Sequence, residues 1–205
     1  VDKIICARYV EVVRVAAGAL RNNLIFMRCM NMDKKEIAMN GAGVAELGFP
    51  MWPQFDPKTK QDMADALDSG LVSYWTGKKG MEFEEKFRQW SGATMAVSCS
   101  CGTAALHIGI SCLGIGPGDE CIVTGYTFFA SCAAIVGAKA IPVIAEVDET
   151  LTIDPADIEK KITPATKGIV CVHMRGVPCD MDAIMAIAKK HDLRVIEDCA
   201  QACGA

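Results

Sequence analysis

Apolar runs of strand length alternate with helix-like stretches in the second half of the chain, and this alternation limits the possible folds more than any other feature. The apolar runs are residues 94–99, 120–124, 140–145, 168–173 and 193–198, and the stretches between them are 102–113, 127–137, 155–161 and 181–191. Strands that alternate with helices are joined by right-handed crossovers, which make the strands parallel and cover both faces of the sheet. We therefore predict an α/β fold with three layers, αβα, around a mainly parallel sheet.

The chain before this region divides into two further parts. Residues 1–48 are predicted to be an N-terminal extension outside the catalytic fold, because they are basic and only loosely helical up to residue 31. Residues 49–92 are predicted to be an arm followed by helices. The arm, FPMWPQFDP, contains three prolines and suits extended chain. The helices are expected at about residues 59–70 and 81–90, where apolar residues recur at helical spacing.

Charge and composition argue against several classes of partner. A net charge of −4 and a pI of about 5.4 give no reason to expect nucleic acid. Charged residues interrupt the apolar windows before the roughly 20 residues that a membrane-spanning helix needs. The 11 cysteines include no CxxC pair and are accompanied by only three histidines, so we expect no metal site. Cys112, Cys121, Cys132 and Cys171 lie in apolar runs, where a free thiol packs as a small core residue, which predicts a reducing, cytoplasmic environment.

Acidic side chains follow the last apolar run, at the point where the strand should end. Glu197 and Asp198 come directly after Val195 and Ile196, and Gln201 follows. Ligands in open parallel sheets bind beyond the carboxyl ends of the strands, so this position favours a binding site. Alternation sends the two carboxylates to opposite faces, and spacing alone does not say which one faces a site. The alternative is a solvated loop acid that caps the next helix.

Two other strand ends add to this candidate site. Gly102, Thr103 and Ala104 begin a helix after the first apolar run, where backbone N–H groups can bind a phosphate. The alternative is that Thr103 is a simple N-cap and Gly102 a turn residue. Phe128 and Phe129 follow the second run, where one ring can cover a flat ligand, unless both pack in the core.

Together the three loops favour a flat, phosphorylated heteroaromatic ligand. A dinucleotide is disfavoured, because the only glycine-rich candidate, GIGPGDE, precedes a strand instead of following one. Pyridoxal 5′-phosphate (PLP) fits all three loops, since an acid beside its ring nitrogen keeps that nitrogen protonated and makes the ring an electron sink.

Eight segments, in order, carry a resemblance to a known family. They are FEEKF (83–87), CGTAAL (101–106), LGIGPGDE (113–120), YTFFAS (126–131), IDPADIEKKITPATKGI (153–169), VHMRG (172–176), DMDAIMAIAKKH (180–191) and IEDCAQACGA (196–205). From about residue 49 onward the chain resembles the PLP-dependent sugar aminotransferases of the DegT/DnrJ/EryC1/StrS family, which have the fold-type I architecture of aspartate aminotransferase. Residues 93–205 would then be the first part of the PLP-binding large domain.

The resemblance implies a role for each matching residue. Gly102, Thr103 and Ala104 would bind the phosphate, Phe128 would stack on the ring, Asp198 would pair with the ring nitrogen as the catalytic carboxylate, and Gln201 would reach the 3-hydroxyl. Family members are homodimers that move an amino group from glutamate or glutamine to a keto group of a nucleotide sugar or cyclitol, in amino sugar biosynthesis. The FPMWPQFD opening is most similar to cyclitol aminotransferases and 3-amino-5-hydroxybenzoate synthases.

Two residues depart from the family pattern. Cys101 stands where the family usually has Ser or Asn, and Arg175 where it usually has an aromatic or apolar residue. A guanidinium at a strand end can meet an anionic substrate, although an exposed surface arginine is the simpler interpretation. His173 is predicted to be a core histidine with its hydrogen bonds satisfied.

The catalytic lysine of the family follows the Asp198 motif, and no lysine follows Asp198 here. The nearest candidates, Lys160, Lys161, Lys167, Lys189 and Lys190, are predicted on or beside connecting helices. We therefore expect these 205 residues alone to be unable to transaminate. Alternative functions are a PLP-dependent dehydratase or lyase, an enzyme like 3-amino-5-hydroxybenzoate synthase, and a non-catalytic binding domain on the same fold.

Overall fold

The computed structural model describes residues 5–6 and 53–204 of the chain. These residues belong to two compact units, one with residues 5–6 and 79–204 and the other with residues 53–78. The predictions for residues 1–4 and 7–52, which include most of the N-terminal extension and the start of the arm, lie outside the described residues.

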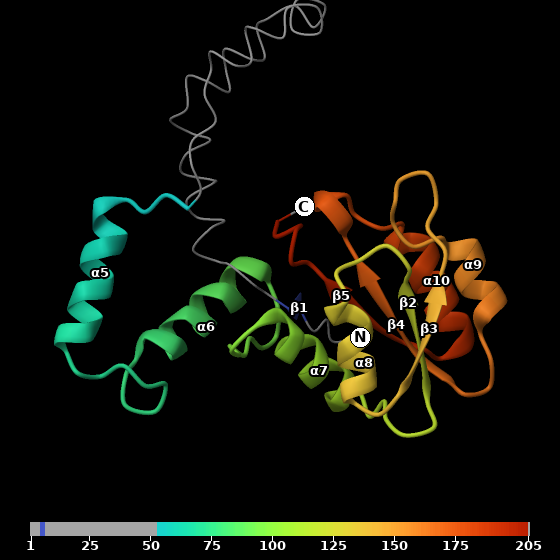
Figure 1. Cartoon of the computed structure of the whole chain (residues 1–205), viewed down its shortest axis with the longest axis horizontal. Helices are drawn as coiled ribbons and strands as arrows, with labels where there is room; N and C mark the ends of the chain where they lie inside the picture. The colour runs from blue at the N-terminus through green and yellow to red at the C-terminus, as the bar shows by residue number, and fades with distance from the viewer. Residues whose placement is uncertain (1–4, 7–52, 205) are drawn as a thin grey trace, which may run out of the picture. The chain divides into compact units, whose positions relative to one another are not determined.

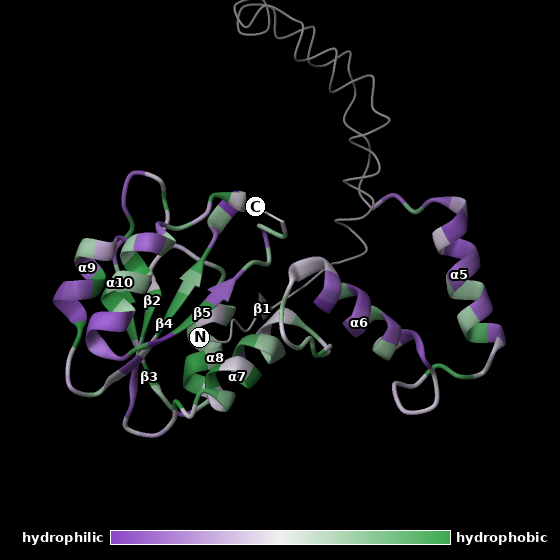
Figure 2. Cartoon of the chain, turned by 180° about the vertical axis from the view of Figure 1, so that it is seen from behind, coloured by the Kyte–Doolittle hydropathy of each residue, from purple (hydrophilic) through white to green (hydrophobic). Residues whose placement is uncertain are grey.

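The smaller unit contains one helix, α5 (Pro57–Asp68). The helix begins two residues before the predicted start, because the Asp56 carboxylate accepts a hydrogen bond from the Thr59 N–H at 2.9 Å and Pro57 occupies the first turn. Gly70, with a φ of 66°, follows its end. The helix is mainly hydrophilic (Figure 2) and buries none of its residues.

The larger unit is built on a five-stranded sheet in which every described pair of neighbours is parallel. Its strands are β1 (Ile5–Cys6), β2 (Glu120–Thr124), β3 (Ile141–Ala145), β4 (Thr166–Val172) and β5 (Arg194–Asp198), in the order β1-β5-β4-β2-β3. The predicted parallel sheet is confirmed. Ile5 and Cys6, however, form a strand beside β5, in a stretch where the sequence predicts loose helix.

Helices cover both faces of this sheet (Figure 1). They are α7 (Gly102–Cys112), α8 (Ala130–Gly137), α9 (Pro155–Lys161) and α10 (Met181–His191). The unit also contains α6 (Lys79–Ser91) and a short 3₁₀ turn, η1 (Met174–Gly176). Leu106 of α7 and Ile135 of α8 share a buried cluster with Val170 and Ile196 of the sheet. Ile158 of α9 and Ile184 of α10 belong to a second buried cluster, together with strand residues whose side chains point to the other face of the sheet. The three-layer αβα architecture is therefore as predicted.

Gly168 lies where the core is most tightly packed around β4. A Cβ at this position would lie 2.5 Å from the Ile115 Cδ1, 3.3 Å from the Arg194 carbonyl oxygen and 3.5 Å from the Cys121 Sγ. The loop that carries Ile115 can therefore press directly onto the backbone of the central strand.

The first predicted strand, residues 94–99, is not a strand in the structure. The N–H and hydroxyl of Ser98 instead both donate to the Glu84 Oε1 of α6, each at 2.7 Å, and Met95 and Val97 are exposed. Apolar alternation indicated strand here, but no described strand lies beside this segment to pair with it. The prediction was wrong in these residues.

The described cysteines are free thiols. Cys121 and Cys171 are buried core residues as predicted, Cys132 is half-buried, and Cys112 is exposed because it ends α7. In the described ranges, no group of three or more His, Cys, Asp and Glu residues is arranged to hold a metal ion. Within the same ranges, no helix has the length and apolarity needed to cross a membrane.

Candidate functional site

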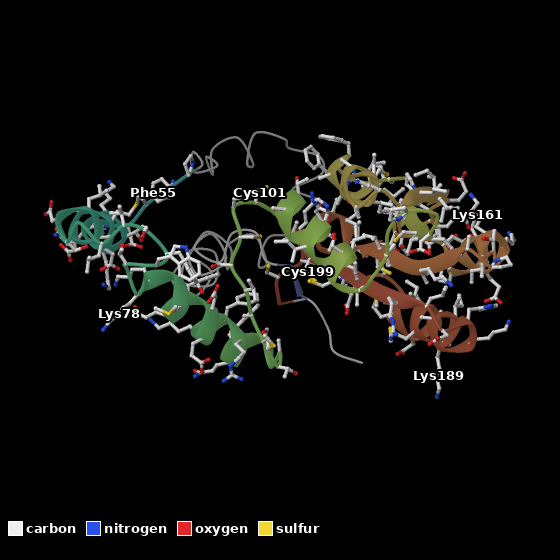
Figure 3. The ribbon with its side chains drawn as sticks, turned by 90° about the horizontal axis from the view of Figure 1, so that it is seen from below. Phe55, Lys78, Cys101, Lys161, Lys189 and Cys199 are labelled. Atoms are coloured by element: carbon white, nitrogen blue, oxygen red, sulfur yellow. The ribbon has the colours of Figure 1, made fainter. Side chains whose placement is uncertain are left out.

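The carboxyl ends of β2, β4 and β5 form the edge of the sheet on which the predicted residues lie. Because the three strands are parallel neighbours, the loops that follow them, which begin at residues 125, 173 and 199, meet at this edge. Helix α7 packs against β5, and its C-terminal end leads through residues 113–119 to the start of β2, so its N-terminal turn points toward the carboxyl edge. Cys101, which precedes α7, and Cys199, which follows β5, are labelled in Figure 3.

The sheet decides which of the two adjacent carboxylates faces α7. Ile196 belongs to the core cluster under α7 and α8, whereas Val195 packs against the cluster under α9 and α10. Alternation places Asp198 on the face of Ile196 and Glu197 on the face of Val195. Asp198 therefore shares a face with α7, and Glu197 lies on the other side of the sheet.

Asp198 is a buried carboxylate with few interactions that compensate for its loss of contact with water. Its side chain is 9% exposed, and among the described residues one hydrogen bond reaches it, from the Ala200 N–H to Oδ1 at 3.0 Å. Burial raises the pKa of Asp198, and the Ala200 N–H and the charge of His173 only partly oppose that rise. A cationic N–H donor beside this carboxylate would stabilise its charged form.

The first turn of α7 is capped by Cys101 and not by Thr103. The Cys101 Sγ accepts a hydrogen bond from the Ala104 N–H at 3.4 Å, and the backbone of Cys101 is extended. The alternative in which Thr103 is the N-cap is therefore wrong, and Thr103 lies inside the first turn with Gly102 and Ala104. The Ala104 N–H lowers the pKa of the Cys101 thiol, as expected where helix N–H groups favour negative charge.

Phe128 and Phe129 are both exposed, by 60% and 70%. Their rings form an edge-to-face pair with centroids 5.1 Å apart. The alternative in which both rings pack in the core is therefore wrong for the described chain. The loop behind them is fixed by a 2.9 Å hydrogen bond between the Thr127 and Ser131 hydroxyls.

Gln201 is oriented by the loop after β4. Its Oε1 accepts a hydrogen bond from the Arg175 N–H at 2.6 Å. A backbone N–H can only donate, so the amide oxygen of Gln201 must face Arg175 and its NH₂ group is turned away as a donor. Sequence spacing did not predict this contact, which joins loops 26 residues apart.

A second unpredicted contact joins the loops after β2 and β4. The Arg175 Nη2 donates to the Tyr126 hydroxyl at 2.6 Å, and the Arg175 Cζ lies 5.5 Å from the Tyr126 ring centroid. Arg175 is exposed, as the simpler interpretation predicted. The only sequence signal for this pair was the unusual arginine in the VHMRG segment.

A family model for the DegT/DnrJ/EryC1/StrS aminotransferase family matches residues 53–205. The chain belongs to this family. It is 39% identical over 172 residues to the L-glutamine:2-deoxy-scyllo-inosose aminotransferase of Streptoalloteichus tenebrarius, covering 81% of this chain and 41% of that protein. It is 40% identical over 154 residues to the GDP-perosamine synthase of Caulobacter vibrioides, covering 75% of this chain and 41% of that protein. The chain thus spans about two fifths of the length of these relatives.

Solved structures of aminotransferases have the same fold. The aminotransferase from Psychrobacter cryohalolentis superposes with a TM-score of 0.75 at 48% identity, covering 77% of this chain and 40% of that one. A sugar aminotransferase from Streptococcus pneumoniae, solved in its PLP form, superposes with a TM-score of 0.69 at 30% identity, covering 74% of this chain and 42% of that one. These neighbours are fold-type I enzymes, and PLP is a cofactor of this family.

The His173 side chain is held by groups other than the Asp198 carboxylate, although its charge acts on the pKa of that carboxyl. His173 is 5% exposed, and its ring lies between the Cys179 N–H, which donates to Nδ1 at 3.1 Å, and the Glu197 Oε2, 3.3 Å from Nε2. The side chains of Cys179, Cys199 and Glu197 raise the pKa of His173, whereas the Cys179 N–H needs an unprotonated Nδ1 and opposes that rise. The prediction of a satisfied core histidine is confirmed.

The five lysines considered from the sequence have other positions. Lys160 and Lys161 are on α9, Lys189 and Lys190 on α10, and Lys167 is an exposed residue near the start of β4. The Lys161 Nζ donates to the Ile144 carbonyl at 2.6 Å, and the Lys190 Nζ pairs with Glu159 at 2.6 Å. Lys161 and Lys189 lie far from Cys101 and Cys199 in Figure 3. These amines thus belong to the face of the sheet opposite Asp198.

Proposed function

We propose that the protein containing this chain is a PLP-dependent aminotransferase that moves an amino group from glutamine or glutamate to a keto group of a cyclitol or nucleotide sugar. The two curated relatives described above, one named for a cyclitol and one for a GDP-linked sugar, support this range of acceptors. The free thiols of the described residues support a reducing, cytoplasmic location, and the family resemblance supports a homodimer.

One observation supports the proposal most directly: a buried carboxylate, Asp198, lies on the same face of the sheet as helix α7. Asp198 has a raised pKa and accepts a single hydrogen bond from the described residues, so it suits the protonated ring nitrogen of PLP. Helix α7 packs against β5, and the N–H groups of its first turn, of which that of Ala104 is bonded to the Cys101 Sγ at 3.4 Å, would suit a phosphate. The donors and acceptors present therefore fit both ends of the cofactor.

The family resemblance supplies a role for each remaining residue, and the contacts of each residue are compatible with that role. Gly102, Thr103 and Ala104 would hold the phosphate, with the Thr103 hydroxyl as an added donor. Phe128, being exposed, would lie against the ring face and exclude water from it. Gln201, with its oxygen held by Arg175, would donate its amide N–H to the 3-oxygen. When bound, PLP supplies the electron sink that makes the α-proton of the amino donor removable.

The role of Asp198 is to keep a proton on the ring nitrogen. Its carboxylate is held rigidly by β5 and the Ala200 N–H, so it does not have to reorganise when charge develops. The proton transfers to and from the substrate require a lysine, and the lysines described above face the wrong side of the sheet. We propose that this lysine is contributed by residues other than 53–204.

The test compares two neighbouring carboxylates in the natural protein at its full length. Asp198→Asn should weaken PLP binding by about 10- to 100-fold, the loss of one charged hydrogen bond, and slow the half-reaction with L-glutamine by about 10²- to 10³-fold. Glu197→Gln removes the same charge on the other face, where its partner is His173, and should change both quantities much less than Asp198→Asn. Cofactor titration and stopped-flow absorbance measure the two quantities. Equal effects of the two substitutions would contradict the proposal.

A further inference from the structure

We propose that Arg175 and Tyr126 form a carboxylate-binding subsite for the amino donor, next to the cofactor site. This inference rests on the proposed function and deepens it, since it names the group that recognises one substrate. Neither residue has a role in the site described so far beyond the backbone contact of Arg175 with Gln201.

The backbone at Arg175 is held in an unusual conformation. Arg175 has a φ of 57° and a ψ of 20°, in the left-handed region that costs a residue with a side chain about 1 kcal/mol. Gly176 follows with a φ of 80°, and a Cβ there would lie 3.2 Å from the Gln201 carbonyl oxygen. Glycine would adopt this conformation at position 175 without that cost. Strain of this kind is typical of residues that a functional site holds in place.

The guanidinium of Arg175 is held in place by a hydrogen bond, but its charge is not neutralised by a carboxylate of the described residues. It donates one hydrogen bond through Nη2 to the Tyr126 hydroxyl, and no carboxylate of the described residues lies within ion-pair distance of it. A guanidinium has five N–H donors in a planar fork, so most of them remain available to a ligand. The side chain is exposed at the carboxyl edge of the sheet, where a substrate would approach.

The Tyr126 hydroxyl adds a second donor beside this fork. Because arginine has no acceptor, the Tyr126 oxygen must accept in their 2.6 Å hydrogen bond, and its own O–H is left to donate elsewhere. A planar carboxylate has two oxygens that can take the guanidinium N–H groups and the phenol O–H together. The pair therefore has the composition of a carboxylate site.

The position of the pair favours the amino donor over the acceptor. The Arg175 N–H bonds to Gln201 at 2.6 Å, and the proposed function places Gln201 beside the ring's 3-oxygen, next to the carbon where amines react. The α-carboxylate of an amino acid is attached to the carbon that bears the reacting amine. The phosphates of a nucleotide sugar are attached at the anomeric carbon and are separated from the keto carbon by carbons of the sugar ring, and a cyclitol has no anionic group. A carboxylate on the donor is thus the anion that lies within reach.

The experiment measures binding of two unreactive analogues to the PLP-loaded natural protein at its full length, by titration calorimetry. Glutaramate is L-glutamine without its amino group, and glutaramide replaces the remaining carboxylate with a neutral amide. The unmodified protein should prefer glutaramate. Arg175→Gly tolerates the left-handed backbone and keeps the N–H to Gln201, and it should weaken glutaramate binding by about 10- to 100-fold. Glutaramide binding should be unchanged, so the preference should disappear.

Three further variants distinguish recognition of the carboxylate by Arg175 from a purely structural role of Arg175. Arg175→Lys keeps the charge without the fork, and Tyr126→Phe keeps the ring without the hydroxyl, so each should lose part of the preference. Arg194→Gln removes an equal charge from the exposed start of β5, at the other edge of the sheet, and should retain the full preference. A purely structural role of Arg175 would alter the binding of both analogues equally.

The outcomes also distinguish this proposal from the proposed function. PLP titration of each variant reports on the cofactor site alone, and Arg175→Gly should leave PLP affinity within about threefold. A retained glutaramate preference in Arg175→Gly, with normal PLP affinity, would overturn the subsite and leave the proposed function standing. A selective loss of UDP affinity in that variant would assign Arg175 to an acceptor phosphate and overturn the donor assignment. Absence of PLP binding by the unmodified protein would overturn both.

Discussion

At the scale of single residues, the buried Asp198 carboxylate suits the proposed cofactor site but lowers the stability of the folded chain. Asp198 is buried with one hydrogen bond, and burial raises its pKa. A carboxyl whose pKa is higher in the folded chain binds its proton more tightly when folded. The free energy of unfolding therefore falls as pH rises from the unfolded value, about 3.9, through the folded value, and stays reduced above it. Asp198, which we assign to the cofactor, therefore lowers the free energy of unfolding of the cofactor-free protein at neutral pH.

Asp198→Asn should therefore stabilise the cofactor-free protein at neutral pH. The expected result is a higher midpoint of urea unfolding at pH 7 than in the parent, with the difference closing as pH falls below about 4. Asp182→Asn is the control, because Asp182 is an exposed acid in the first turn of α10 and its removal should give no gain. Identical midpoints for Asp198→Asn and the parent at pH 7 would mean that the buried charge carries no penalty.

Gly168 provides a second prediction at this scale. A Cβ at this residue would lie 2.5 Å from the Ile115 Cδ1, so Gly168→Ala should lower the free energy of unfolding by about 1–3 kcal/mol. Ile115→Val removes that Cδ1 and should recover part of the loss in the double variant. At Gly116 the nearest atom would be 3.8 Å away, so Gly116→Ala should be nearly neutral. Denaturant unfolding of the parent, the three single variants and the double variant measures these changes. A neutral Gly168→Ala would show that the loop carrying Ile115 moves aside at little cost.

At the scale of elements, periodicity predicted most helices and strands of the larger unit to within two or three residues. Side-chain hydrogen bonds account for the differences from the prediction, and two of them join residues distant in the sequence. Residues 94–99 alternate like a strand, but the Ser98 N–H bonds to the Glu84 carboxylate of α6. The cap of α7 was assigned to Thr103 in one alternative, although Cys101 makes the contact. The Arg175–Tyr126 contact joins residues 49 positions apart, which no local pattern encodes.

The N-terminus of α7 can be probed through its own thiol. The Ala104 N–H lowers the pKa of Cys101, while burial raises the pKa of Cys121 to about 12. Iodoacetamide at pH 7 should label Cys101 much faster than Cys121, since the thiolate is the reactive form. PLP should slow labelling of Cys101 if its phosphate binds this helix turn. Cys112, exposed at the other end of α7, is the control that PLP should not protect. Mass spectrometry of the labelled peptides gives each rate, and no protection at Cys101 would contradict the phosphate site.

At the scale of the whole molecule, the alternation of strands and helices predicted the three layers correctly. The alternation determines both that the strands run parallel and that helices cover the two faces of the sheet. The faces of individual side chains were harder to predict. Glu197 and Asp198 could not be told apart by spacing, and the structure separates them only through the packing of Val195 and Ile196. The exposure of Phe128 and Phe129 was likewise open, because a strand-end aromatic can turn inward or outward. The family resemblance, not the residue pattern, supplied their proposed roles.

The arrangement of lysines gives a prediction for these 205 residues as one recombinant chain. Lys161 and Lys190 are engaged by other groups, and they lie on the helix layer opposite Asp198. Incubation with PLP and reduction with borohydride should therefore give only slow, scattered pyridoxyl labels on exposed lysines such as Lys189. Peptide mapping would locate them. A single lysine labelled stoichiometrically at micromolar PLP, together with turnover, would contradict the assignment of the catalytic lysine to other residues.

The opposite orientations of Glu197 and Asp198 limit which insertions and deletions β5 can accept. β5 pairs with β4 so that Glu197 lies beside Cys171 and Asp198 beside Val172. A one-residue insertion or deletion within β5 would turn Glu197 toward α7 and Asp198 toward His173, while leaving a sheet of normal appearance. Only changes by an even number of residues keep each carboxylate on its own side. Among descendants of this sequence, β5 should therefore tolerate substitutions far better than single-residue changes in length.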